Sequence, residues 1–362
     1  MIYREYGRTG KKVSVIGFGG MRFRKEDYGE KAALVVRKAS ELGINYFDTA
    51  PLYCDDKSEE IFGLAFQDMP GQFYISTKSM ISHEPDADAV RKRLDKSLQR
   101  LGVEKIDFFH MWNILNLEQY RQVIAPGGPY QGARQAQEEG LVEHIVFSTH
   151  CDGDEIEAIV QEGYFEGMTV GYNAINFPFR EKGLQAAAKM GLGIATMNPL
   201  GGGLIPQNPD YFKFLQEFGD ETVVQAALRF NASHQEISTV LAGMGSIEEV
   251  VENVQVGAEI RPMSDQKMAQ IKSQLNEAMN QLCTGCGYCK GCPVDIPIPK
   301  YLDAYNMYIL QKNTQGITDR LKWHWRLPAE KAGECIECGV CEAKCTQKLP
   351  IIDRLKMIAE KC

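Results

Sequence analysis

Two features of this 362-residue sequence predict an α/β fold with a small second domain. Short apolar runs alternate with longer helical patterns over residues 1–262, which is typical of a (β/α)8 TIM barrel. After Pro262 the alternation stops and the chain becomes mainly helical and rich in cysteine. We therefore expect a barrel domain over 1–262 and a second domain over 263–362.

Local turn, strand and capping patterns in the sequence predict the barrel elements in chain order. A hairpin is expected in residues 1–17, because a Thr9-Gly10 turn separates two short strand patterns. The expected barrel strands are Val15–Gly17, Tyr46–Phe47, Phe73–Ser76, Ile106–Phe109, His144–Phe147, Met168–Val170, Gly193–Thr196 and Ser238–Leu241. Helical patterns separate these strands. One helix is expected after Ser246, with Glu249 completing a capping box.

The second domain is defined by two runs of cysteine. The first run is Cys283, Cys286, Cys289 and Cys292, and the second is Cys335, Cys338, Cys341 and Cys345. Each run supplies four thiolates, which is the number that a 4Fe-4S cluster requires, so two runs predict two clusters. The second domain is therefore expected to be a mainly helical iron–sulfur domain that handles single electrons.

Zinc and disulfides are the alternatives for these cysteines. A zinc ribbon separates its two cysteine hooks by a long hairpin, whereas each run here packs four thiols into ten or eleven residues. Disulfides fit less well, because the total of eleven cysteines is odd and the first residues lack the apolar core of a signal peptide. Iron–sulfur chemistry is favoured over both.

Composition excludes several classes of partner. The net charge is −8 and no basic run interleaves with aromatic residues, so nucleic acid is not an expected partner. No apolar stretch approaches the length of a membrane span, so no membrane partner is expected either. The expected location is the cytoplasm.

The expected strand ends carry polar residues where TIM barrels place their chemistry. With these motifs the chain resembles the aldo/keto reductase family, and within it the subgroup with a C-terminal ferredoxin-like 4Fe-4S domain. The motifs, in chain order, are Gly7-Arg-Thr-Gly10, Asp48-Thr-Ala-x-x-Tyr53, Ser58-Glu59-Glu60, Ser76-Thr-Lys78, Pro199-Leu-Gly-Gly-Gly203, Gly243-Met-Gly-Ser246 and Glu252-Asn253. The resemblance covers nearly the whole chain.

The resemblance implies a catalytic group made of Asp48, Tyr53, Lys78 and a histidine. Tyr53 would donate a proton to a carbonyl oxygen during hydride transfer. The pKa of a free tyrosine is near 10, and a neighbouring Lys78 ammonium held by Asp48 would lower it. The family's histidine position holds Trp112 here, while His110 lies two residues earlier. Either His110 serves through a local shift, or Trp112 fills the place and the group is incomplete.

Nucleotide binding is also implied by the resemblance. Gly201, Gly202 and Gly203 would approach a pyrophosphate, and Gly243 and Ser246 would open a helix whose N-terminus favours anions. Asn253 matches an adenine contact and Ser148 a nicotinamide contact. Departures occur at Thr149, Tyr172 and Met197. Glu249 argues mildly against NADP as the obligatory form, because a carboxylate repels a 2′-phosphate.

In two-cluster ferredoxins the last cysteine of each run binds the other cluster. By that resemblance one ligand set is Cys283, Cys286, Cys289 and Cys345, and the other is Cys335, Cys338, Cys341 and Cys292. The spacing before Cys292 is one residue shorter than the usual bacterial spacing, and Thr346 stands where a proline is usual.

A nicotinamide passes two electrons as a hydride, whereas a cluster accepts one, and FMN is a possible converter between them. We expect two 4Fe-4S clusters and NAD(P)H, with a small-molecule substrate and a ferredoxin or other one-electron partner. Two alternatives remain open. The barrel could bind nucleotide as a redox sensor, or it could be a scaffold for an electron-transfer module.

Overall fold

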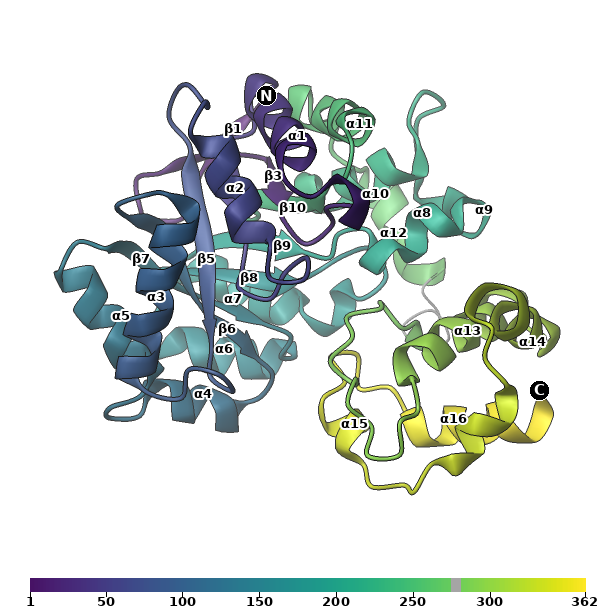
Figure 1. The fold of residues 1–362 in the computed structure, drawn as a ribbon. Helices are drawn as coiled ribbons and strands as arrows, with labels where there is room; N and C mark the ends of the chain where they lie inside the picture. The colour runs from purple at the N-terminus through teal and green to yellow at the C-terminus, as the bar shows by residue number, and fades with distance from the viewer. Residues whose placement is uncertain (275–280) are drawn as a thin grey trace. The chain divides into compact units, whose positions relative to one another are not determined.

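A closed barrel of parallel strands forms the larger, N-terminal part of the computed structural model, which describes residues 1–274 and 281–362 (Figure 1). Its strands are β3 (Ile16–Gly19), β4 (Tyr46–Asp48), β5 (Tyr74–Met80), β6 (Ile106–Ile114), β7 (Val142–Thr149), β8 (Gly167–Gly171), β9 (Gly193–Met197) and β10 (Thr239–Gly243). They pair in chain order, and β10 closes the ring on β3. The predicted TIM barrel is confirmed, with every expected strand present.

Helices follow the strands and cover the outside of the barrel (Figure 1). They are α1 (Glu30–Glu41), α2 (Ser58–Phe66), α3 (Ala87–Leu101), α4 (Leu117–Ile124), α5 (Pro129–Glu138), α6 (Gly153–Gln161), α7 (Glu181–Lys189), α10 (Val223–Ser233) and α11 (Ile247–Ala258). Their apolar faces are buried. In α3, for example, Val90, Leu94 and Leu101 are fully buried along one side of the helix.

The N-terminal hairpin supplies a plug for one end of the barrel. Strands β1 (Tyr3–Glu5) and β2 (Lys12–Ser14) pair antiparallel, and the buried ring of Tyr6 follows β1. A Cβ atom on Gly193 or Gly167 would lie 2.0 Å or 2.6 Å from that ring, so only glycine fits at the start of β9 and β8. The plug occupies the amino ends of the strands, which leaves the carboxyl ends for chemistry.

The chain divides into two compact units. The first comprises Met1–Pro199 and Asp220–Met263, and the second comprises Leu200–Gly219 and Ser264–Cys362. Helices of the second unit are α8 (Leu204–Gln207), α9 (Pro209–Phe212), α12 (Asp265–Gln274), α13 (Ile298–Gln311), α14 (Gln315–Asp319), α15 (Val340–Ala343) and α16 (Ile351–Lys361). The insertion at 200–219 departs from a simple division at Pro262, because the segment after β9 packs among its own short helices and with α12.

The core of the second unit mixes aliphatic side chains with cysteine. Tyr301, Leu302, Ile351, Leu355 and Ile358 pack in one buried cluster, which also contains Cys283, Cys289, Cys341 and Cys345. The cysteine runs themselves form loops, apart from the short helix α15. None of the helices in the described residues is long and apolar enough to cross a membrane.

Candidate functional site

The carboxyl ends of β4 and β5 bring a buried ion pair together. Asp48 is the last residue of β4, and Lys78 lies in the second half of β5. Lys78 Nζ donates to Asp48 Oδ1 at 2.5 Å and to the carbonyl of Thr49 at 2.7 Å, and the lysine side chain is 1 % exposed. Burial lowers the pKa of Lys78, while the Asp48 charge opposes that shift.

Tyr53 lies beside this lysine. Lys78 Nζ is 5.4 Å from the centroid of the Tyr53 ring, and the ring is half-buried. An ammonium this close to the aromatic face is attracted to the ring and favours an anionic phenolate. The structure thus brings Asp48, Lys78 and Tyr53 into one group, as the sequence predicted.

The two candidates on β6 occupy different places. Trp112 packs edge-on against Tyr53, with ring centroids 5.5 Å apart and planes at 89°. His110 is fully buried at the register of Lys78, with Nδ1 3.1 Å from Ser76 Oγ and Nε2 2.8 Å from Thr169 Oγ1. The place beside Tyr53 is therefore filled by Trp112, while both nitrogens of His110 are engaged inside the barrel.

Ser76 links His110 to the ion pair. Its hydroxyl donates to Asp48 Oδ1 at 2.7 Å, so Lys78, Asp48, Ser76 and His110 form one chain of contacts. Burial and the Lys78 charge lower the pKa of His110 well below its ordinary value, which leaves the imidazole neutral. Ser76 was not singled out from the sequence as a site residue, although its place two residues before Lys78 on a strand puts both on one face.

The loop that carries Tyr53 has an unusual backbone. Leu52, Cys54, Asp55 and Asp56 all have positive φ angles, between 53° and 69°. Such angles disfavour residues with a Cβ, so the surroundings must hold the loop in place.

Arg100 in α3 provides that hold. Its Nη1 and Nη2 donate to the two carboxylate oxygens of Asp56, each at 2.7 Å, and Asp56 Oδ1 also accepts from the backbone N–H of Leu52 at 3.1 Å. The guanidinium lowers the pKa of the Asp56 carboxyl well below its usual range. Sequence reasoning missed this pair, because Arg100 lies 44 residues away and reads as an ordinary charge on an exposed helix face.

Ser148, the predicted nicotinamide contact, and Tyr172, a departure from the family pattern, both have hydrogen-bond partners within the protein. Ser148 is fully buried in β7, and its hydroxyl accepts from the backbone N–H of Asn113 at 2.9 Å. Asn113 itself has a φ of 65° at an irregularity in β6. Tyr172 is buried, and its hydroxyl lies 3.2 Å from Nε2 of His234, the residue that follows α10. These contacts stabilise the strand ends and occupy one hydrogen-bonding position of each hydroxyl.

The predicted phosphate contacts fall in both units. Gly201, Gly202 and Gly203 belong to the second unit and have φ angles of 61°, 72° and 99°, a run that only glycine adopts readily. Gly243 and Ser246 belong to the barrel unit. Ser246 caps α11 by accepting from the N–H of Glu249 at 3.4 Å.

Asn253 and Glu249 lie on α11. Asn253 is buried, and its Oδ1 has no hydrogen-bond partner within the described residues. The Glu249 carboxylate accepts from the N–H of Gly245 at 2.6 Å and lies 3.4 Å from Arg24 Nη2. The expected capping box is therefore only half formed, because Glu249 turns to Gly245 instead of the N–H of Ser246.

One set of cysteines is enclosed in the second unit. Cys283, Cys289 and Cys345 are each at most 9 % exposed. Burial raises the pKa of the Cys283 thiol, and the charges of Cys286, Cys289 and Cys345 raise it further. We call Cys283, Cys286, Cys289 and Cys345 the inner group, following the ligand set that the ferredoxin resemblance implies.

The chain holds the inner group by specific contacts. Asn306 of α13 brackets Cys283, accepting from its backbone N–H and donating to its carbonyl, each at 2.8 Å. Cys286 Sγ lies 3.4 Å from Thr346 Oγ1, and the N–H of Leu349 donates to Cys345 Sγ at 3.4 Å. Thr346, which replaces the usual proline, thus gives the inner group a hydroxyl contact.

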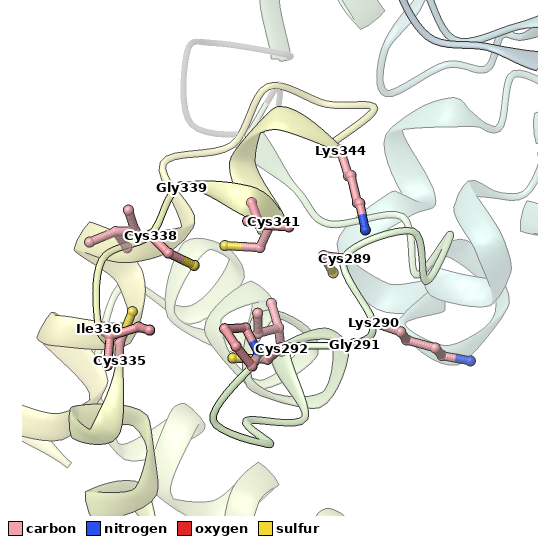
Figure 2. Close-up of a pocket in the computed structure, with 14 residues that line it drawn as sticks. Cys289, Lys290, Gly291, Cys292, Cys335, Ile336, Cys338, Gly339, Cys341 and Lys344 are labelled. Atoms are coloured by element: carbon pink, nitrogen blue, oxygen red, sulfur yellow. The ribbon is translucent and has the colours of Figure 1, made fainter. Parts of the chain in front are cut away.

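The other four cysteines of the two runs lie around a hollow in the same unit. Its lining includes Cys292, Cys335, Cys338 and Cys341 together with Cys289 of the inner group, and Figure 2 shows their side chains around the gap. We call Cys292, Cys335, Cys338 and Cys341 the outer group. Cys338 is exposed, and its neighbours Ile336 and Val340 are 59 % and 42 % exposed. Within the described residues, no three His, Cys, Asp or Glu side chains form a group that could hold a metal ion.

The kind of donor suits iron–sulfur chemistry, although no three of the described thiols lie close enough together to form a metal site. The two runs supply eight thiols, and Arg354 of α16 is 2 % exposed with an Nη1 that has no hydrogen-bond partner in the described residues. The charges of Cys283 and Cys345 act on this guanidinium. A buried cation beside thiols suits a group that carries negative charge, as a thiolate-bound cluster does.

Comparison with known proteins identifies both parts of the chain. The model of the aldo/keto reductase family matches residues 15–276. The chain belongs to this family. A 4Fe-4S dicluster domain matches residues 282–349, so this family member is an oxidoreductase with a C-terminal iron–sulfur domain. Among curated relatives, L-galactose dehydrogenase from Arabidopsis thaliana is 25% identical over 315 residues, covering 76% of this chain and 95% of the relative.

Solved structures in the family share the barrel. An aldo-keto reductase from Bacillus halodurans, in its holo form, superposes with a TM-score of 0.63 at 21% identity and covers 76% of this chain and 96% of its own. An aldo/keto reductase from Klebsiella pneumoniae, solved with NADP and acetate, gives 0.60 at 20% identity and covers 74% and 93%. These likenesses support the fold, and the family supports a nicotinamide cofactor.

Proposed function

We propose that this enzyme reduces a small carbonyl compound, with Tyr53 as the general acid. The observation that carries the proposal is the Lys78 ammonium, which is buried, held by Asp48 at 2.5 Å and lies 5.4 Å from the Tyr53 ring centroid. Bound NAD(P)H would supply the hydride, and each 4Fe-4S cluster passes one electron at a time. The protein's own task is to deliver a proton to the carbonyl oxygen.

Each residue of the group has a distinct part in that task. Tyr53 donates its phenolic proton, and the Lys78 charge stabilises the phenolate that remains. Asp48 fixes the lysine, and Ser76 fixes Asp48. His110 acts as a positioning residue through Ser76, because both of its ring nitrogens already have partners. Trp112 is the side chain that shapes the substrate position next to Tyr53.

The nucleotide contacts are proposed with less specific roles. Ser148 and Asn253 would bind the two ends of the cofactor, and Gly243 and Ser246 would accommodate its phosphates. The loop of Gly201–Gly203 is proposed separately, by itself, as a phosphate-contacting loop. The link between Glu249 and Arg24 reduces the charge that a 2′-phosphate would meet, so NADP(H) and NAD(H) are both proposed. FMN would serve instead where a converter to single electrons is needed.

Two clusters complete the proposal. The inner group would hold one and the outer group the other, with the ligand sets that the ferredoxin resemblance implies. An external one-electron partner such as a ferredoxin would exchange electrons at the outer group, since Cys338 and its apolar neighbours Ile336 and Val340 are exposed.

Replacement of Tyr53 tests the catalytic assignment. In anaerobically purified protein, Tyr53→Phe should lower kcat for aldehyde-dependent NADPH or NADH oxidation by ~10²–10⁴-fold, the usual worth of a general acid. Iron content and the visible spectrum should not change. Tyr164→Phe is the matched control, because Tyr164 is exposed on the barrel surface. Full activity in Tyr53→Phe would show that the acid is assigned wrongly.

A second candidate function is nucleotide-dependent redox sensing or electron transfer without turnover. It is favoured by Trp112 in the position beside Tyr53 and by the internal bonds of Ser148. Wild-type protein that binds NAD(P)H tightly, reduces its clusters and oxidises no cofactor with a panel of aldehydes and ketones would support this function over the first.

A further inference from the structure

The two cysteine groups differ in how far they are shielded from water. Three inner residues, Cys283, Cys289 and Cys345, are at most 9 % exposed, whereas the outer group contains the exposed Cys338 as well as the buried Cys341. Lysines near the outer group, Lys290 and Lys344, are themselves exposed on the rim of its hollow (Figure 2). Their charges are therefore screened by solvent and ions. The inner group has a different kind of cation beside it.

That cation is Arg354, which is 2 % exposed. Its guanidinium lies 4.7 Å from the Tyr305 ring centroid, and Nη2 donates to Gln281 Oε1 at 3.3 Å. Within the described residues, Nη1 has no hydrogen-bond partner and no carboxylate forms an ion pair with Arg354. The groups whose charges act on it are Tyr305, Cys283 and Cys345.

Local structure places this charge at the inner group. Arg354 lies in the first turn of α16, where its backbone N–H bonds the carbonyl of Pro350. The turn that leads into the helix donates the Leu349 N–H to Cys345 Sγ at 3.4 Å. Cys345 and Arg354 are thus parts of one short segment. Ile351 and Leu355, on either side of Arg354, pack in the same core as Cys283 and Cys345.

A buried cation without a counter-charge is strongly destabilising, because the charge loses its hydration. Neutral thiols cannot supply that counter-charge. A 4Fe-4S cluster with four thiolates is a dianion when oxidised and gains one more negative charge when reduced. A fixed positive charge therefore stabilises the reduced form more than the oxidised form, and at low effective dielectric its effect persists over several ångströms.

We propose that Arg354 is a positioning residue that fixes a positive charge beside the inner cluster and raises the reduction potential of that cluster relative to the same cluster without the charge. This inference rests on the proposed pair of clusters. An external one-electron reductant would be oxidised at the outer group, and its electron would pass to the inner cluster without bond or proton changes.

The test is a redox titration of the anaerobic, iron-loaded protein, monitored by electron paramagnetic resonance. Arg354→Gln should lower the potential of one cluster by at least 59 mV, which is a tenfold change in its reduced-to-oxidised ratio for a one-electron couple. The other cluster should not move. Arg354→Lys keeps the charge and should restore most of the potential. Cys338→Ser, which changes an outer ligand, assigns the two signals.

A second variant tests the same charge without replacing a core residue, in case Arg354→Gln does not fold. Gln281 is exposed and accepts from Arg354 Nη2, so Gln281→Glu places a carboxylate on the guanidinium without disturbing the core. It should lower the same potential in the same direction, by less than Arg354→Gln. Lys361→Gln removes an exposed charge from the same helix and should shift neither cluster. If Arg354→Gln does not load iron, Gln281→Glu and Arg354→Lys decide the matter.

Two failures can be told apart. Wild-type protein with far fewer than about eight iron atoms per chain, or with a single cluster signal, would refute the pair of clusters itself. Two normal clusters whose potentials are unchanged in both Arg354→Gln and Gln281→Glu, or shifted equally, would refute only the role of Arg354.

Discussion

The barrel site and the cysteine groups are built to different degrees by the chain alone. In the barrel, Lys78 has two oxygen partners and Asp48 is held by Ser76, so the polar groups satisfy one another. In the second unit, thiols form part of the hydrophobic core and Arg354 keeps an unpartnered nitrogen. The barrel site is therefore organised by the protein alone, whereas the cysteine groups need a bound cluster to satisfy their charges.

Removal of iron should give the largest difference between the two units. Anaerobic chelation from the full chain should expose α13 and α16 to hydrogen exchange, with protection lost by at least about a hundredfold, because cluster binding is part of that unit's folding energy. Amides of α3 in the barrel should keep their protection. Equal loss in both units would show that the barrel also depends on the clusters, and unchanged α16 protection would show that the second unit folds without them.

Loss of the buried lysine charge should be the largest single-residue effect in the barrel. Lys78→Met leaves Asp48 as an unpaired buried carboxylate, which should lower the free energy of unfolding by about 3–5 kcal/mol and abolish turnover. Chemical denaturation with global analysis of the barrel transition measures the change. Adding Asp48→Asn should recover much of the stability but none of the activity. Additive losses in the double variant would contradict a coupled pair.

A smaller effect is expected at the clamp on the Tyr53 loop. Asp56→Asn removes the charged partner of Arg100 and should cost ~0.2–1 kcal/mol of stability, since the pair is partly exposed. We expect kcat to fall about tenfold as the strained loop relaxes and misplaces Tyr53. Asp55→Asn is the matched control, because its carboxylate pairs with the exposed Lys25 at the surface of the loop. Equal kcat values for the two variants would show that the Arg100–Asp56 pair does not position Tyr53.

The same clamp predicts a pH dependence with a definite sign. The folded pKa of Asp56 lies below its unfolded value, so the stability it contributes is fully present above about pH 4 and is lost as the pH falls toward the lower folded value. The difference in unfolding free energy between wild type and Asp56→Asn should therefore shrink below pH 4. A difference that grows on acidification would contradict the assignment.

The smallest expected effect concerns cofactor choice. Glu249→Gln removes a carboxylate near the proposed 2′-phosphate position and should raise the NADPH-to-NADH ratio of kcat/KM by a few-fold, up to about fivefold for ~1 kcal/mol. Glu248→Gln, one residue earlier and exposed, is the control. An unchanged ratio would place the phosphate elsewhere.

Sequence alone predicted the barrel well, because each strand is a short apolar run and each helix has a periodic face. It also named Asp48, Tyr53 and Lys78, which lie at neighbouring strand ends. It did not predict the Arg100–Asp56 clamp, because that contact joins segments far apart in the chain. Arg354 carried a readable signal, since it interrupts the apolar stripe of Ile351, Leu355 and Ile358, yet only tertiary packing shows what it faces.

The exposed position of Cys338 also has a consequence for how the clusters would be lost when the enzyme is exposed to air. Oxygen reaches an uncovered ligand first, so oxidative loss should begin at the outer cluster while the inner one survives behind the core. A briefly aerated sample should then pass through a state with about four iron atoms per chain before losing the rest. Timed iron counts after exposure would show whether the two clusters decay in succession, with the outer one serving as a sacrificial cover for the inner.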